Sequence, residues 1–274
     1  MKTIQSKSLL TLIIIFFIIG FSTSAKNFIG LNSNYLDSIP DNYVGQNMYL
    51  IHNPDRVVYP ANLKEHREES KAYVKRYSEK ERAYIIHMFN KGKKYFSTAT
   101  NIFDKYNVPY ELQMLPALES NFTANAVSPA GAVGYWQFMT ELAGEYGLKT
   151  GGKNDERKNF SKSTNAAAKF FRDQLEVFNN DILLTVAAYN CGQGYVKRAI
   201  KKSKEADADY WDIKNHLPAE TRRFVMNFVS LNVIALNYDK FLSRKLNFDE
   251  PHLIQLAATD STVQPDYSVS RNSL

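Results

Sequence analysis

Apolar residues recur at helical spacing over most of the chain between residues 61 and 241, and no convincing run alternates as a strand would. Pro109 should end the first helical stretch, because the residue before a proline is pushed out of the helical region. Gly92 is a candidate interruption within that stretch, and Asp181 is a candidate N-cap. The pattern predicts an all-α fold with helices over residues 61–106, 110–120, 163–178, 181–190, 195–202 and 218–241.

The first 25 residues have the pattern of a secretory signal peptide. Lys2 and Lys7 precede an apolar run over residues 9–21, and Thr23 and Ala25 supply the small residues of a cleavage site. The alternative is an uncleaved membrane anchor, but the run is shorter than the roughly 20 apolar residues that a spanning helix needs. We therefore expect cleavage after Ala25 and export to the periplasm or cell envelope.

Charge and composition narrow the possible partners. The formal charge is +6, and removing Lys2 and Lys7 from it leaves +4. This bias suits contact with an anionic envelope polymer, whereas basic residues scattered among acidic ones give little support to nucleic-acid binding. The five histidines lack ligand spacing, so neither a metal site nor a cofactor is indicated. The only cysteine, Cys191, is expected to be a buried structural thiol.

Glu119 is the acidic residue with the most unusual surroundings. It follows the apolar segment 112–118 and precedes a loop that ends in Tyr135 and Trp136. A carboxyl group desolvated in this way has a raised pKa and can donate a proton near neutral pH. The two aromatic rings could stack on sugar faces or pack in the core, and composition alone leaves both alternatives open.

Three motifs occur in order: residues 115–122 (LPALESNF), 128–137 (SPAGAVGYWQ) and 183–190 (LLTVAAYN). In these motifs the sequence resembles the lytic transglycosylases with a soluble-type (SLT) catalytic domain. The Trp-Gln pair that ends the second motif is similar to the membrane-bound lytic transglycosylase D branch, in glycoside hydrolase family 23. Three motifs with matching intervals are far more specific than any one of them.

The resemblance implies a fold, a domain organisation and a set of partners. A goose-type, lysozyme-like helical catalytic domain would span residues 101–241. A partly helical N-terminal extension would occupy residues 26–100, and a tail residues 242–274. The substrate would be peptidoglycan glycan strands, with possible envelope association, and we expect a monomer.

The resemblance also implies roles for individual residues. Glu119 would be the catalytic acid and base, Gln137 would help to position the sugar, and Tyr189 would direct its hydroxyl toward the Glu119 carboxyl. Ser120 and Asn190 would support the site or contact the substrate, although both could equally be helix-end capping residues. Residues 220–225 (ETRRFV) resemble a fourth family motif that often has tyrosine at the position of Phe224, so a substrate-facing hydroxyl is missing there.

The implied reaction needs only one carboxyl group. Ordinary glycosidases use two, but in this family the six-hydroxyl of N-acetylmuramic acid serves as the nucleophile and a 1,6-anhydro ring forms. Two rival hypotheses are a muramidase that uses a second carboxylate and water, and a non-catalytic peptidoglycan-binding protein. The acidic residues nearby in sequence are expected to be solvated charges or caps: Glu141, Glu145, Asp155 and Glu156.

Overall fold

The computed structural model describes residues 57–60, 67–205 and 207–248 of the 274-residue chain. These residues form no strand, and their isolated bridges include Val127–Val133 and Val133–Phe138, so the prediction of an all-α fold is confirmed for the described part of the chain. The predicted signal peptide and most of the predicted tail lie outside the described residues. The α-helices are α2 (Arg67–Lys80), α3 (Arg82–Lys105), α4 (Leu115–Ser120), α5 (Thr140–Glu145), α6 (Phe160–Val177), α7 (Ile182–Cys191), α8 (Gln193–Ser203), α9 (Tyr210–Ile213), α10 (Ala219–Leu236) and α11 (Tyr238–Leu242), and the 3₁₀ helices are η4 (Tyr110–Met114), η5 (Glu156–Lys158) and η6 (Lys214–His216).

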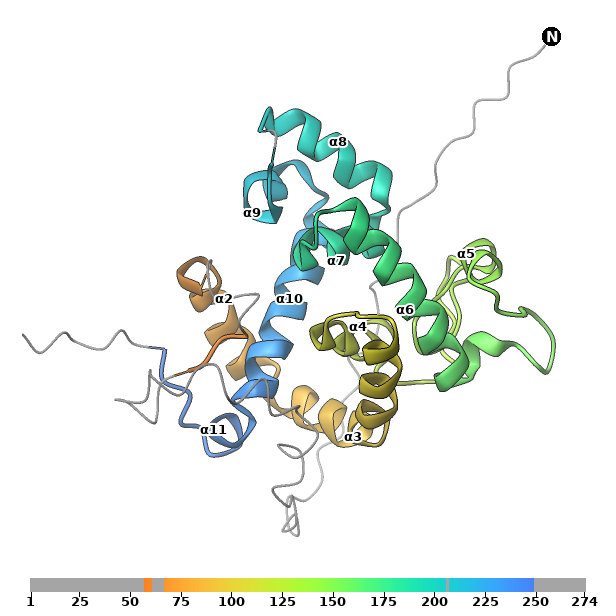
Figure 1. Cartoon of the computed structure of the whole chain (residues 1–274). Coiled ribbons are helices and arrows are strands. Elements are labelled where there is room, and N and C mark those ends of the chain that lie inside the picture. Colours follow the sequence, from red (N-terminus) through yellow and green to blue (C-terminus); the bar gives the residue numbers. More distant parts are fainter. Residues whose placement is uncertain (1–56, 61–66, 206, 249–274) are drawn as a thin grey trace, which may run out of the picture.

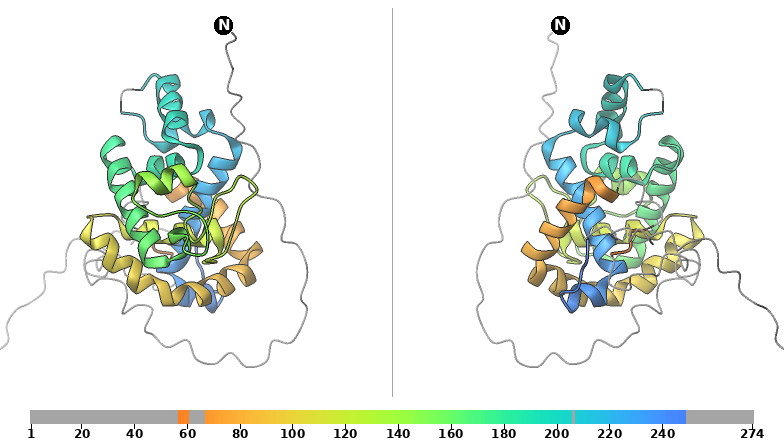
Figure 2. Two further views of the ribbon diagram at one scale, coloured as in Figure 1. Left: turned by 90° about the vertical axis from the view of Figure 1, so that its right-hand side faces the viewer. Right: turned by 90° about the vertical axis from the view of Figure 1, so that its left-hand side faces the viewer.

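Helix α10 lies at the centre of the molecule (Figure 1). It packs against α2, α7 and α4, and eleven of its side chains are buried, because it is apolar around most of its circumference. Helix α3 packs against α6 and η4, at the opposite end of the molecule from α8 and α9 (Figure 2). Helix α4, which carries Glu119, therefore lies between α3 and α10.

Side-chain caps begin α6 and α7; Asp181 is the predicted cap, whereas α6 begins at Phe160, three residues before its predicted start. Asp181 caps α7 by accepting a hydrogen bond from the backbone N–H of Leu184 at 2.8 Å. Asn159 caps α6 in the same way, with the N–H of Lys162 as donor at 3.0 Å. Each cap satisfies an N–H group that has no partner within its helix.

Gly92 does not interrupt α3, contrary to the expectation from sequence. The helix continues through it, and the absence of a side chain makes room for Phe122. A Cβ atom at residue 92 would lie only 2.5 Å from Cε2 of the Phe122 ring. Gly92 is thus a packing position, where the chain that follows α4 crosses α3 closely.

The predicted helix 61–106 is divided at Glu81, between α2 and α3, and two further predicted helices are also divided. The predicted helix 110–120 is divided into η4 and α4 because Pro116, in the first turn of α4, has no N–H to continue the hydrogen-bond ladder. The predicted helix 218–241 is divided at Asn237. The Asn237 side chain donates to the carbonyls of Val233 and Val58 at 2.7 and 2.6 Å and accepts from the N–H of Val58 at 2.8 Å.

A single hydrophobic core joins segments on both sides of the domain boundary expected at residues 100 and 101. That boundary falls within α3, and core side chains range from Val57 to Phe241. The N–H of Val57 donates to the carbonyl of Asn247 at 2.9 Å, so segment 57–60 lies against the chain that follows α11. The described part of the extension therefore packs together with the motif-bearing helices.

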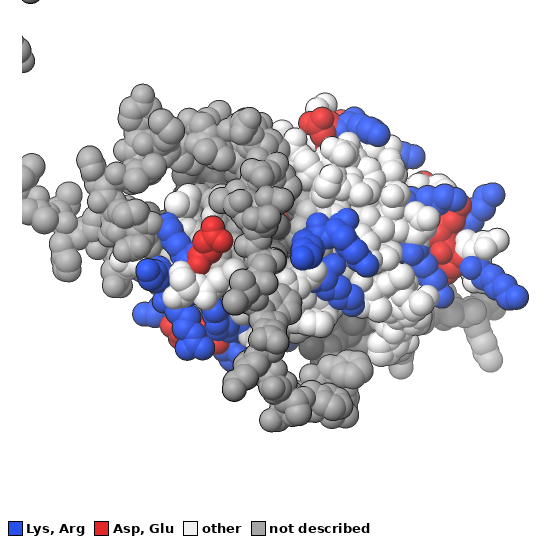
Figure 3. All heavy atoms as spheres, turned by 90° about the horizontal axis from the view of Figure 1, so that it is seen from below, with Lys and Arg blue, Asp and Glu red and all other residues white. Residues whose placement is uncertain are grey.

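Surface charge is divided among separate groups. On the face seen from below, Lys and Arg side chains form several clusters, and Asp and Glu lie beside some of them (Figure 3). In the part of the chain that the structure describes, no helix is both long and apolar enough to cross a membrane.

Candidate active site

Glu119 lies in the last turn of α4, where the chain reverses sharply. Asn121 and Phe122 both have left-handed backbone conformations, with φ of 49° and 51°. The N–H of Asn121 donates to Ala117 O at 3.0 Å and that of Phe122 to Pro116 O at 3.1 Å, which closes the end of the helix. The reversal lets the segment that follows α4 fold back beside Glu119.

The Glu119 carboxyl has a strongly raised pKa. The residue as a whole is half-buried, but its carboxyl is deep enough that burial raises its pKa from 4.5 to about 8. The negative charge of Glu220, in the first turn of α10, is the second and smaller cause of the same rise. Glu119 can therefore stay protonated near neutral pH, as a general acid must before it donates.

Tyr189 lies beside Glu119 but has another hydrogen-bond partner than expected. Its hydroxyl donates to the backbone carbonyl of Trp136. Burial raises the pKa of Tyr189 well above its ordinary value, and the charge of Glu119 adds to this, so the two groups are close in space. Tyr189 thus joins α7 to the segment that carries the second motif.

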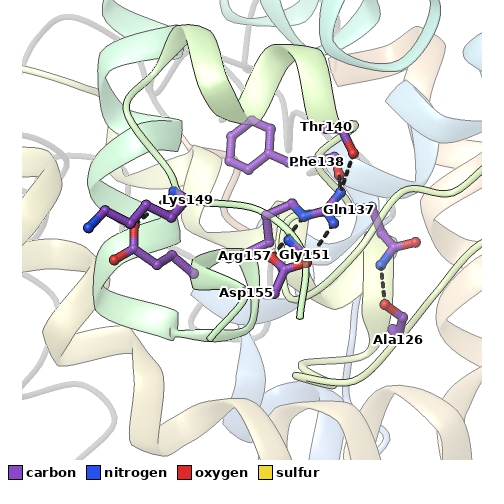
Figure 4. Close-up of polar contacts among 9 residues, drawn as sticks. Ala126, Gln137, Phe138, Thr140, Lys149, Gly151, Asp155 and Arg157 are labelled. Atoms are coloured by element: carbon purple, nitrogen blue, oxygen red, sulfur yellow. Dashed lines mark hydrogen bonds and ion pairs between the residues drawn. The ribbon is translucent and has the colours of Figure 1, made fainter. Parts of the chain in front are cut away.

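Gln137 is held in a left-handed conformation, with φ of 48°. Its Nε2 donates to the carbonyls of Gly134 at 2.8 Å and Ala126 at 3.2 Å, which fixes the side-chain amide on the loop. Figure 4 shows the second of these bonds. Its carbonyl oxygen accepts no hydrogen bond from the described residues. That oxygen is the part of Gln137 that can contact a ligand.

Ser120 and Asn190 both make hydrogen bonds to other protein groups, and the bond of Asn190 is to a side chain of α10 rather than to a helix end. The Ser120 hydroxyl donates to the carbonyl of Tyr135 at 2.9 Å and accepts from the N–H of Thr123 at 3.2 Å. Asn190 Oδ1 accepts from the Thr221 hydroxyl at 2.8 Å and so joins the end of α7 to α10. Both residues hold the surroundings of Glu119 in place.

Tyr135 and Trp136 are core residues in this structure. Trp136 is 0% exposed, and its indole N–H donates to the Thr164 hydroxyl at 3.0 Å. Tyr135 is 8% exposed, and its hydroxyl is 3.0 Å from that of Tyr95. Of the two alternatives for these rings, the burial favours core packing over stacking on a sugar. The backbone carbonyl of Tyr135, however, accepts from Ser120, and that of Trp136 accepts from Tyr189.

Most of the acidic residues near the second motif lie as expected, with one exception. Glu141 and Glu145 are exposed, and Glu156 accepts from Lys162 Nζ at 2.6 Å. The view of Asp155 as a solvated charge is wrong: it is 7% exposed because it pairs with the buried Arg157 guanidinium. It also caps η5, which was the other alternative.

Glu220 is the neighbour of Glu119 that sequence reasoning missed. In the sequence it is only one residue of the fourth motif. Its place in the first turn of the helix predicted over residues 218–241 is the one feature that sets it apart. Phe224, four residues along, is 8% exposed and packs in the core. Within the described residues, no group of three or more His, Cys, Asp or Glu side chains could hold a metal ion.

Comparison with known proteins identifies the class of domain. Residues 97–212 match the family model described as the Transglycosylase SLT domain. All three ordered motifs fall within these residues, as does Glu119. This part of the chain therefore has the sequence of a transglycosylase SLT domain, in agreement with the resemblance carried by the motifs.

The particular relatives point in the same direction. The chain is 36% identical over 162 residues to membrane-bound lytic murein transglycosylase D of Escherichia coli strain K12, which is 58% of this chain and 35% of that protein. It is 38% identical over 93 residues to peptidoglycan transglycosylase gp16 of Escherichia phage T7, which is 33% of this chain and 7% of that protein. The chain thus spans about a third of the length of the Escherichia coli relative.

Among solved structures, lytic transglycosylase Slt of Pseudomonas aeruginosa aligns with 55% of this chain and 24% of its own. The TM-score is 0.44 and the sequence identity 22%.

Proposed function

We propose that this chain is a peptidoglycan lytic transglycosylase. It would cleave the β-1,4 bond between N-acetylmuramic acid and N-acetylglucosamine in glycan strands and leave 1,6-anhydro-N-acetylmuramic acid ends, in cell-wall remodelling or turnover. The observation that carries the proposal is the Glu119 carboxyl, whose pKa burial raises to about 8, inside an SLT domain. The names of the Escherichia coli and phage relatives, a murein and a peptidoglycan transglycosylase, support peptidoglycan as the substrate.

In the proposed reaction Glu119 acts twice. The protonated carboxyl donates its proton to the glycosidic oxygen as the bond from C1 of N-acetylmuramic acid to that oxygen breaks. The carboxylate then takes the proton of the six-hydroxyl of the same sugar while its oxygen bonds to C1. Glu119 is returned to its protonated form, and no water is consumed.

The surroundings of Glu119 would support both steps. Gln137 can accept a hydrogen bond from the sugar through its carbonyl oxygen, because its amide nitrogen is already bound to the loop. Tyr189 holds the Trp136 carbonyl beside the site. Positioning groups of this kind lower the barrier because the reacting atoms are held at the required distance in advance.

One observation favours the muramidase rival. Glu220 lies near enough for its charge to raise the pKa of Glu119, so a second carboxylate is present that could activate water. Mass spectrometry of the fragments released from purified peptidoglycan separates the two reactions. The lytic transglycosylase reaction gives 1,6-anhydro ends, lighter by one water than the reducing ends of hydrolysis, and fragments with reducing ends would overturn the proposal.

Tyr189→Phe is expected to lower turnover more than stability. The ring still packs against Phe170 and Phe171, with centroid separations of 5.4 and 5.3 Å, but the hydrogen bond to the Trp136 carbonyl is lost. A single hydrogen bond contributes about 0.5–1.5 kcal/mol to stability. Its loss at a positioned site can cost at least about tenfold in kcat. Unchanged kcat with a lowered melting temperature would show that Tyr189 only packs.

The location is also a proposal, which rests on residues outside the described structure. The basic start, apolar run and small residues of segment 1–25 predict export and cleavage after Ala25. The relative's name, membrane-bound lytic murein transglycosylase D, supports an envelope location. N-terminal sequencing of the exported protein should find Lys26 first, and a mature protein that still begins at Met1 would contradict cleavage.

A further inference from the structure

The segment 134–138 supplies backbone carbonyls to two residues that adjoin Glu119, and it also carries Gln137. The Tyr135 carbonyl accepts from Ser120, the Trp136 carbonyl accepts from Tyr189, and Gln137 presents its side-chain amide. Gln137 does this from a left-handed backbone conformation, which is uncommon for a residue other than glycine. Such a conformation persists only where the structure around it holds it in place.

Arg157 contacts both ends of this segment, and Figure 4 shows its contacts at the Phe138 end. Its Nη1 donates to the carbonyl of Phe138 at 3.0 Å and to the hydroxyl of Thr140 at 3.3 Å. At the other end, Gly134 lies so close to the backbone of residue 157 that a Cβ atom would be 2.1 Å from the Arg157 carbonyl oxygen. Both ends of the segment therefore pack against Arg157, which comes about twenty positions later in the chain.

Asp155 fixes the guanidinium that makes these contacts. Its two carboxylate oxygens accept from Arg157 Nε at 2.9 Å and Nη2 at 2.6 Å, a bidentate arrangement. The hydrogen bonds from Arg157 lower the pKa of Asp155 to about 2, so the pair stays charged. The two residues are only 7% and 5% exposed.

A buried ion pair is not needed for stability alone. The cost of removing two charges from water can exceed their attraction, and apolar residues of similar volume often replace such pairs without loss. Apolar residues cannot supply hydrogen bonds of fixed geometry. The forked guanidinium holds the Phe138 carbonyl, the Thr140 hydroxyl and the Asp155 carboxylate at once.

We infer that Asp155 and Arg157 are positioning residues, which hold segment 134–138 in place beside Glu119. They thereby keep the Tyr189–Trp136 contact and the Gln137 amide in the geometry that turnover requires. The effect on turnover rests on the proposed function. The effect on Glu119 does not, because a loosened segment admits water to the carboxyl whatever reaction it performs. The inference therefore has one readout that depends on activity and one that does not.

Arg157→Lys is the decisive variant. Lysine keeps the positive charge beside Asp155 but lacks the fork that reaches Phe138 and Thr140 at the same time. We expect kcat on peptidoglycan to fall by about tenfold or more, with a much smaller change in KM. We also expect the titration midpoint of Glu119, measured by ¹³C NMR on glutamate-labelled protein, to move down toward its ordinary range.

Arg172→Lys is the matched control. It makes the same chemical change in an exposed pair with Asp173 on α6, with no contact to segment 134–138. Both variants keep Glu220 and Tyr189, the titratable groups that interact electrostatically with Glu119. The control should match the wild type in kcat and in the Glu119 midpoint.

The inference is overturned if Arg157→Lys lowers the melting temperature but leaves kcat and the Glu119 midpoint at their wild-type values. Should Arg157→Lys not fold, Thr140→Val removes one of the contacts to Arg157 and leaves the ion pair intact; it should shift both quantities in the same direction by less. No shift in either would overturn the inference too. If the wild type releases no anhydro ends, the proposed function fails, and the Glu119 midpoint still decides this inference.

Discussion

Glu119→Gln is expected to abolish release of peptidoglycan fragments while the protein stays folded. Glutamine has nearly the shape of the protonated carboxyl but has no proton to donate and cannot accept one. A single general acid or base contributes about 10²–10⁴-fold to a rate. Because Glu119 would serve as both, a loss at or beyond the upper part of that range is expected, measured as soluble fragments released per unit time.

Glu220→Gln is the control for this variant, because it changes the other carboxyl of the site in the same way. Under the proposed reaction Glu220 transfers no proton, so activity should persist. Its charge is one cause of the raised pKa of Glu119, so the pH dependence should move to lower pH. If Glu220→Gln lost activity and Glu119→Gln retained it, the catalytic carboxyl would be that of Glu220, and our assignment to Glu119 would be wrong.

Glu119→Gln is also expected to make the protein more stable at alkaline pH. The folded-state pKa of Glu119 is raised from 4.5 to about 8. Between these values the unfolded chain binds fewer protons at this residue than the folded chain does, so the wild type loses stability as pH rises through this window. The variant has no such titration, and its advantage over the wild type should grow by up to roughly 4–5 kcal/mol between pH 4 and pH 9.

Urea unfolding of the two proteins at pH 4 and pH 9 measures this difference. They share every other titratable group, so the change in their stability gap isolates Glu119. A gap that is the same at both pH values would mean that the carboxyl is not desolvated in the folded protein. The proposed acid would then lack its physical basis.

Features of the fold that depend on nearby residues could be predicted from sequence. The Asp181 cap and the Pro109 boundary are local signals, because each acts on a hydrogen bond within a few residues of itself. Features that depend on packing could not. Gly92 looks like a helix breaker until the Phe122 ring is seen against it, and Asn237 divides a helix by binding segment 57–60, 179 residues earlier in the chain.

The candidate site shows the same division. The motifs were enough to select Glu119, Gln137 and Tyr189, but not to give Tyr189 its partner, which is a backbone carbonyl 53 residues away. Glu220 could not be placed beside Glu119 without the packing of α10 on α4. Asp155 reads as a surface charge in sequence because only the fold shows that Arg157 lies buried beside it.

Digestion of peptidoglycan in water enriched in ¹⁸O tests the central claim most directly. If the six-hydroxyl of N-acetylmuramic acid is the nucleophile, the new ends formed by the wild type carry no ¹⁸O and are 1,6-anhydro sugars, and Glu119→Gln forms neither kind of end. If water is the nucleophile, each new reducing end carries one ¹⁸O atom. Label in the new ends would contradict the account and identify the enzyme as a hydrolase.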